Sequence, residues 1–200
     1  MKILVVTSYY SPHISGLTLY VEKLCRVLVN LGHQVTVLTN QHDSSLKLKE
    51  ASPSLTIVRL PINFHLSKSP VSFSLPSALF RLLGSHDLIV TILPSLESVL
   101  VSTLARLLGK KLLAIHLCDP IVTGKFGFLT TFAVTLANFF ACFLAHAIVT
   151  LTQDYADHSP VLKYFLSKVT PIPPPVEVGK QNSREIRQIK SQIGPAKYTI

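Results

Sequence analysis

A polar segment at residues 8–16 directly follows an apolar, strand-like run and holds several side chains suited to binding. Ser15 and Gly16 are a pair of small residues where a helix is expected to begin, so a ligand can approach the backbone there. The free N–H groups of a helix N-terminus are well placed to bind a phosphate. Tyr10 and His13 lie earlier in the segment, where they either line an acceptor pocket or belong to the loop surface.

A histidine and an aspartate form the second candidate site. His116 ends an apolar run at residues 111–116, and Asp119 follows three residues later. Ligands bind at the carboxyl ends of parallel strands, so His116 is expected to point into a crevice. An imidazole there can hydrogen-bond a sugar hydroxyl or carry a proton. The alternatives are a satisfied histidine at a strand end and an aspartate that caps the following loop.

Several other kinds of site lack the residues that they need. The remaining histidines show no metal-ligand spacing such as H-x-x-x-H with a nearby acid, so we expect no metal site. Residues 8–16 contain one glycine instead of G-x-G-x-x-G, and the second strand-like run ends in Asn40 instead of an acid, which argues against NAD. The chain has no G-x-x-x-x-G-K-[ST] motif, and it lacks the flavin loop or clustered acids of flavodoxin-like and response-regulator-like modules.

Alternating strands and helices are expected to position these residues. Most of the strand-like runs are apolar on both faces, which is typical of strands buried in a parallel sheet. The expected strands are residues 2–7, 34–39, 56–60, 88–93, 111–116, 147–151 and 169–172. The expected helices are residues 17–31, 73–83, 96–108, 126–144 and 154–166. This order predicts an α/β fold with a doubly wound, Rossmann-like parallel sheet.

Composition restricts the partners and the compartment. The chain has 200 residues and a formal net charge of +9, which favours acidic partners such as phosphates or anionic lipid. No Lys/Arg block is dense enough to indicate nucleic acid, so we expect no nucleic-acid partner. The three cysteines show no paired spacing, which predicts a reducing, cytoplasmic compartment.

An uncharged stretch covers residues 126–153 and is long enough to span a bilayer. A membrane span is disfavoured because the strand at 147–151 follows directly and must rejoin the same sheet. We expect a buried or surface-docked helix instead. Basic residues lie nearby in sequence, and an apolar helix beside basic residues suits docking on anionic lipid at the inner face of the cell membrane.

In chain order, the motifs resemble the N-terminal half of a family-4 glycosyltransferase. The early motifs are Tyr10-Ser11-Pro12, Ser15-Gly16 and Gly32-His33-Gln34-Val35. The later ones are the His-x-x-Asp loop at 116–119, the strand at 147–152 and the segment at 169–177. The resemblance covers nearly the whole chain. Ser15 stands where the family has the first residue of a Gly-Gly pair, a difference that bears on the usual contact with the donor phosphate.

The resemblance implies a GT-B enzyme, in which two Rossmann-like domains enclose a cleft. Residues 1–176 would be the acceptor-side domain, and 177–200 would be a linker and the start of a donor-binding domain supplied in cis or in trans. Ser15 and Gly16 would lie near the donor diphosphate. His116 would contact the donor sugar or an acceptor hydroxyl, and Asp119 would orient the acceptor or His116.

These expectations lead to two functional hypotheses. The first is a retaining, metal-independent and cofactor-independent transferase that moves a sugar from a nucleotide sugar to a lipid or saccharide acceptor. This chain alone would then show little or no transfer. The second is a non-catalytic subunit of a split glycosyltransferase, which binds the acceptor and anchors the complex to the membrane.

Overall fold

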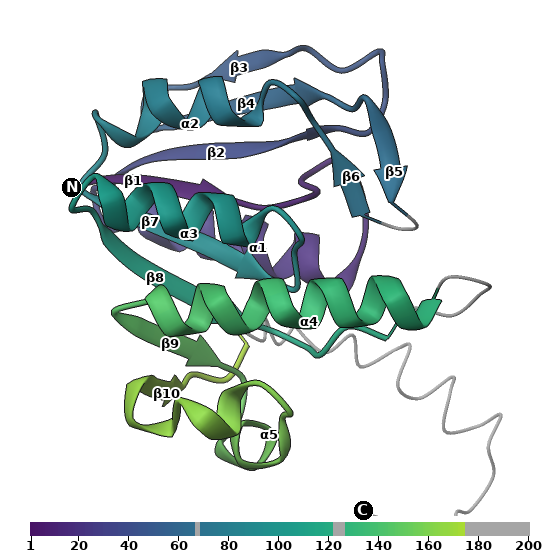
Figure 1. Cartoon of the computed structure of the whole chain (residues 1–200). Coiled ribbons are helices and arrows are strands. Elements are labelled where there is room, and N and C mark those ends of the chain that lie inside the picture. Colours follow the sequence, from purple (N-terminus) through teal and green to yellow (C-terminus); the bar gives the residue numbers. More distant parts are fainter. Residues whose placement is uncertain (67–68, 122–126, 175–200) are drawn as a thin grey trace, which may run out of the picture.

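The structure is a computed structural model that describes residues 1–66, 69–121 and 127–174. Its main sheet has eight strands in the order β10-β9-β8-β7-β1-β2-β4-β3 (Figure 1). These strands are β1 (Lys2–Val6), β2 (Gln34–Gln41), β3 (Lys49–Ala51), β4 (Leu55–Pro61), β7 (Leu88–Leu93), β8 (Lys111–His116), β9 (Ala147–Thr150) and β10 (Val169–Pro171). Neighbouring strands pair in parallel, except that β3 is antiparallel to β4. The expected α/β fold with a mostly parallel sheet is confirmed.

Helices cover both faces of this sheet, as a doubly wound fold requires. The helices are α1 (Gly16–Asn30), α2 (Leu75–Leu83), α3 (Ser98–Leu107), α4 (Gly127–Leu144) and α5 (Gln153–His158). Helix α1 packs on one face through Val21 and Cys25, while α2, α3 and α4 cover the other (Figure 1). The short α5 lies beside the β9 and β10 edge.

The central strands contribute side chains to two separate cores. Leu4 and Ile89 belong to the core beneath α2, α3 and α4, whereas Ile3, Val5 and Val90 belong to the core beneath α1. Successive side chains of a strand point to opposite faces, so a strand covered on both faces must be apolar at every position. This explains the uninterrupted apolar runs in the sequence.

The expected helix at residues 154–166 is wrong in its second half. Helix α5 ends at His158, and Ser159 adopts an extended conformation with φ −64° and ψ 131°. The next residue is Pro160, which disfavours helical backbone at the residue before it and has no N–H to donate. The chain continues in two 3-10 turns, Leu162–Tyr164 and Leu166–Lys168.

Helix α3 begins two residues later than the sequence predicts. Ser95, the residue before the expected start, accepts a hydrogen bond from the Glu97 N–H at 3.2 Å, and the helix starts at Ser98. The sequence prediction also missed β3 and a separate antiparallel hairpin formed by β5 (Phe64–Leu66) and β6 (Ser69–Val71). These strands are three residues long and carry polar residues or proline, so they give no recognisable pattern.

Strand order brings the two candidate segments to one edge of the sheet. Strand β7 lies between β1 and β8, and its last residue, Leu93, pairs in register with His116. The loops after β1 and β8 therefore flank β7 at the carboxyl edge, where ligands bind in open α/β sheets. Residues 177–200, the expected linker and domain start, lie outside the described residues.

Candidate active site

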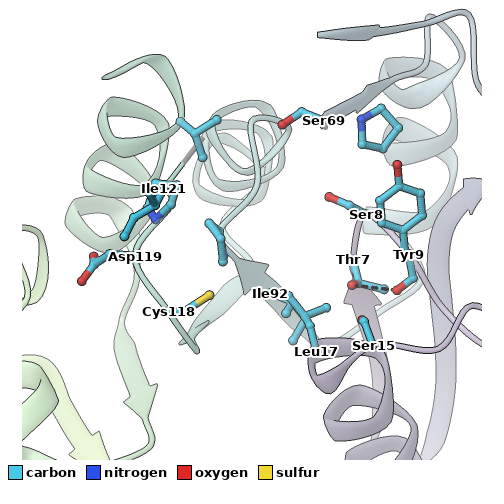
Figure 2. Close-up of a pocket in the computed structure, with 14 residues that line it drawn as sticks. Thr7, Ser8, Tyr9, Ser15, Leu17, Ser69, Ile92, Cys118, Asp119 and Ile121 are labelled. Carbon is cyan, nitrogen blue, oxygen red and sulfur yellow. Dashed lines mark hydrogen bonds between the residues drawn. The ribbon is translucent and has the colours of Figure 1, made fainter. Parts of the chain in front are cut away.

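A cavity of about 390 Å³ lies at the carboxyl edge of the sheet. One wall comes from the loop after β1 and the start of α1, and the opposite wall comes from the loop after β8 (Figure 2). Ile92 and Pro94 of the β7 end also line it, and Ser69 and Pro70 of β6 lie at its rim. The cavity thus joins the two segments that the sequence singles out.

Ser15 lines the cavity and also caps α1. Its Oγ accepts a hydrogen bond from the Thr18 N–H at 3.2 Å, and the Ser15 N–H donates to Thr18 Oγ1 at 2.8 Å. The reciprocal pair forms a capping box, so the serine hydroxyl is engaged by the helix. Gly16 is exposed, and a Cβ added there would meet nothing within 4 Å. The helix start is therefore open to a ligand.

Tyr10 does not reach this cavity. Its side chain is 3% exposed and packs in the core beneath α1, where burial raises the pKa of its hydroxyl. Tyr9 lines the cavity instead (Figure 2). The Tyr9 ring stacks on that of His13, which is not among the lining residues, with centroids 4.7 Å apart. His42 meets His13 edge to face at 5.3 Å. Tyr9, and not the predicted Tyr10, is therefore the tyrosine of this loop that faces the cavity.

His116 lies behind the cavity wall. Its side chain is fully buried, and its Nε2 is 3.7 Å from Asp119 Oδ1. Burial lowers the pKa of His116 to about 4, although Asp119 acts in the opposite direction, so the imidazole is neutral at pH 7. The residues that form the wall itself include Cys118, Asp119 and Ile121. In Figure 2 the carboxylate oxygens of Asp119 lie on the side of its backbone away from the cavity.

Two residues of the α5 segment contact this pair and were missed from the sequence. The Tyr155 hydroxyl is 3.2 Å from His116 Nδ1, and the Ser159 hydroxyl donates to Asp119 Oδ1 at 2.9 Å. Both lie about forty residues beyond their partners. Only the pairing of β8 with β9 brings them together, so no local sequence signal identifies them.

A half-buried carboxyl group at the start of α3, that of Glu97, was also missed. Glu97 accepts hydrogen bonds from the Asn40 amide, which also donates to the Ser8 carbonyl at 3.2 Å. Burial raises the pKa of Glu97 to about 7, with the Asn40 hydrogen bond acting in the opposite direction. The negative charge of Glu97 contributes to a raised pKa of Tyr9, after burial. Residues 1–66, 69–121 and 127–174 hold no group of three or more His, Cys, Asp or Glu placed to bind a metal.

The mostly parallel sheet and its flanking helices define a Rossmann-like domain of the kind found in GT-B glycosyltransferases. Residues 15–175 match the family described as "Glycosyl transferase 4-like domain". The chain therefore belongs to this glycosyltransferase family. No curated protein sequence matches the chain.

Solved glycosyltransferase structures share the fold. Sucrose-phosphate synthase from Thermosynechococcus elongatus superposes with a TM-score of 0.57 at 16% identity, over 86% of this chain and 47% of that one. HepE from Anabaena, solved with UDP and glucose, gives 0.53 at 13% identity, over 97% and 50%. Arabidopsis thaliana UGT89C1, complexed with UDP-L-rhamnose, gives 0.51 at 15% identity, over 98% and 55%. The chain spans about half the length of these three proteins.

Proposed function

We propose that this chain is the acceptor-side half of a retaining glycosyltransferase that moves a sugar from a nucleotide sugar to a lipid or saccharide acceptor. The single observation that carries the proposal is the shared cavity, which has the capped start of α1 on one wall and Asp119 on the other. Membership of a glycosyltransferase family supports sugar transfer as the reaction that this cavity serves.

The chemistry assigned to each wall follows from the groups it holds. The first N–H groups of α1 beside Ser15 and Gly16 suit the donor diphosphate, since a helix N-terminus favours negative charge. Tyr9 presents a flat aromatic ring and a hydroxyl to an acceptor sugar, and His13 stacks on that ring. The nucleotide sugar is a substrate, and the reaction as proposed needs neither a metal nor a cofactor.

The chain spans about half the length of the glycosyltransferase structures that share its fold, so the proposal includes a second, donor-binding domain. That domain would be joined through residues 177–200 or supplied by another chain. Sugar transfer then needs both halves, because the nucleotide sugar must be held opposite this wall before the reacting atoms can align.

The test combines this chain with a donor-binding domain encoded by the same or a neighbouring gene. UDP- and GDP-sugars are offered with a polyprenyl phosphate, a lipid-linked saccharide or a free saccharide, and products are identified by mass spectrometry. We expect a glycosylated product with both halves present, with the donor's anomeric configuration kept in its NMR spectrum. Turnover by the 200-residue chain alone, or no product with any acceptor, would contradict the proposal.

A second candidate, a membrane-anchoring acceptor subunit, is favoured by the outer face of α4. Within the described residues, α4 is the one helix long and apolar enough to cross a membrane, and 39% of its apolar window is buried. Its inner face packs on α3 and β8, and buried Asn138 accepts a hydrogen bond from the Ser95 N–H at 3.2 Å. This packing supports a surface-docked helix, not a membrane span.

The outward face of α4 is strongly apolar. Phe128, Phe132 and Phe143 are 87%, 58% and 59% exposed. Lys168 lies beside this face, with its Nζ 5.8 Å from the centroid of the Phe143 ring, and Lys163 is exposed nearby in the same segment. Aromatic rings next to ammonium groups match the boundary between acyl chains and anionic headgroups. We therefore propose a peripheral, cytoplasmic location on the inner face of the cell membrane for either candidate.

A further inference from the structure

Four polar side chains form a connected cluster behind the cavity wall. His116 and Asp119 come from β8 and its loop, while Tyr155 and Ser159 come from α5 and the residue that caps it. Two hydrogen-bond contacts and one close approach link the four groups. Tyr155 and Ser159 have no part in the proposed function.

The hydroxyl of Ser159 has a fixed direction. Its Oγ accepts hydrogen bonds from the N–H groups of Val161 and Leu162, both at 3.3 Å. Its single proton is therefore free to point only outward, toward Asp119 Oδ1 at 2.9 Å. One carboxylate oxygen of Asp119 is thus held by a residue whose own position is set by the turn after α5.

The tautomer of His116 follows from the groups on either side of its ring. Asp119 Oδ1 lies 3.7 Å from Nε2, and that nitrogen is buried without a hydrogen-bond partner among the described residues. A carboxylate repels the lone pair of an unprotonated nitrogen and attracts an N–H, so the proton belongs on Nε2. Nδ1 is then left as an acceptor 3.2 Å from the Tyr155 hydroxyl, which also interacts with Asp119.

We propose that Tyr155 and Ser159 are positioning residues that hold His116 and Asp119 in place. His116 and Asp119 in turn fix the loop at residues 117–121. The loop itself, including Cys118 and Ile121, then forms the surface that meets the ligand. The buried imidazole and the carboxylate that is turned away thereby help to set the shape of this surface. This assignment rests on the proposed function only for the identity of the ligand as a sugar.

The hydrogen-bond arrangement is tested in this chain without any substrate. NMR of ¹⁵N-histidine-labelled protein reports which ring nitrogen carries the proton, and the signals of His116 are assigned by their loss in His116→Gln. We expect His116 to be the neutral Nε2–H tautomer at pH 7. Tyr155→Phe removes one hydroxyl and should shift the tautomer ratio toward Nδ1–H by roughly two- to tenfold, the effect of one ordinary hydrogen bond.

Tyr164→Phe is the matched control, because Tyr164 is 65% exposed in the same segment and should leave the His116 signals unchanged. Ser159→Ala also removes the acceptor of two backbone N–H groups, so Ser159→Thr, which keeps the hydroxyl, serves as the conservative partner. A His116 that carries its proton on Nδ1 in the wild-type chain, or that does not respond to Tyr155→Phe, would overturn the arrangement.

The role of the cluster is tested in the complete two-domain enzyme. Ser159→Thr keeps the hydroxyl for Asp119 and should retain kcat/KM to within about threefold. Ser159→Ala releases Asp119 and its loop and should lower kcat/KM by about ten- to a hundredfold. A Ser159→Ala enzyme with the kcat/KM of the wild type would overturn the positioning role. The NMR experiment needs no sugar transfer. It therefore tests the hydrogen-bond arrangement of the cluster separately from the proposed function.

Discussion

The Asn40 amide donates a hydrogen bond to each carboxylate oxygen of Glu97, at 3.3 Å each. This contact joins the end of β2 to the start of α3 across the end of β1, since Asn40 also donates to the Ser8 carbonyl. The arrangement places a half-buried titratable group next to the loop that carries Tyr9. Neither residue is assigned a role by the proposed function, so the effect of Glu97 on stability can be measured separately from the reaction.

Stability should fall as pH rises because of Glu97. Its pKa is about 7 in the folded chain, against 4.5 for an unperturbed glutamate side chain. A carboxyl whose folded pKa is raised stabilises the fold fully below its unfolded pKa, and that contribution is lost as pH rises through the folded value. Glu97→Gln should therefore be more stable than wild type at pH 8, by up to about 3 kcal/mol, and similar at pH 4. Urea unfolding at both pH values measures this, and parallel pH dependences would refute it.

Ser15 should behave first as a helix cap. Ser15→Ala leaves the Thr18 N–H without its acceptor and should lower the free energy of unfolding by about 1 kcal/mol. Ser15→Gly should cost only a few tenths of a kcal/mol, because glycine is tolerated at this position of a helix. Thermal unfolding of the two variants compares them directly. Equal losses would mean that the serine hydroxyl contributes nothing to α1.

The outward face of α4 should bind anionic vesicles. Phe128→Ser with Phe132→Ser removes two aromatic rings that are 87% and 58% exposed, and should weaken binding to phosphatidylglycerol-containing vesicles at least tenfold. Phe73→Ser is the control, since Phe73 is 72% exposed on another part of the molecule. Co-sedimentation with anionic and with purely zwitterionic vesicles gives the measurement. Wild-type protein that stays in the supernatant with both would exclude membrane docking.

Cys118 should be the thiol that reacts first with iodoacetamide. It is exposed at the cavity, whereas burial raises the pKa of both Cys25 and Cys142 to about 12. Burial and then the charge of Asp119 raise the pKa of Cys118, so its reaction should be slower than that of a free thiol. Asp119→Asn removes that charge and should accelerate alkylation severalfold at pH 7.5. Mass spectrometry of intact protein over time measures the rate, and an unchanged rate would show that Asp119 has no effect on the thiol.

Strands covered on both faces made the fold predictable. Residues 88–93 and 111–116 are apolar almost throughout because each contributes to two cores, and short apolar runs of this kind are typical of buried parallel strands. The helix at 154–166 misled the prediction because Leu162 and Phe165 fall at helical spacing. Both side chains are indeed buried, but they reach the core from 3-10 turns after a proline.

The site was predictable only where it is local in sequence. His116 ends β8 and Asp119 lies in the loop after it, while Ser15 and Gly16 lie where the segment after β1 enters α1. The strand order therefore places both segments at one edge. The choice between Tyr9 and Tyr10 depends on the orientation of one loop, which hydrophobicity does not specify. Partners such as Tyr155 meet their targets only through tertiary pairing, so no pattern within their own segment points to them.

The end of helix α5 just before Pro160 affects the wall of the cavity that contains Asp119. Successive residues of a helix turn by about 100°, so one more helical residue in α5 would rotate the Ser159 hydroxyl around the helix axis and away from Asp119. Pro160 prevents this rotation, because it disfavours helical backbone at Ser159 and α5 therefore ends at His158. The position of Asp119 in the cavity wall therefore depends on where a neighbouring helix ends, and a substitution that extended α5 would alter a cavity that α5 does not line.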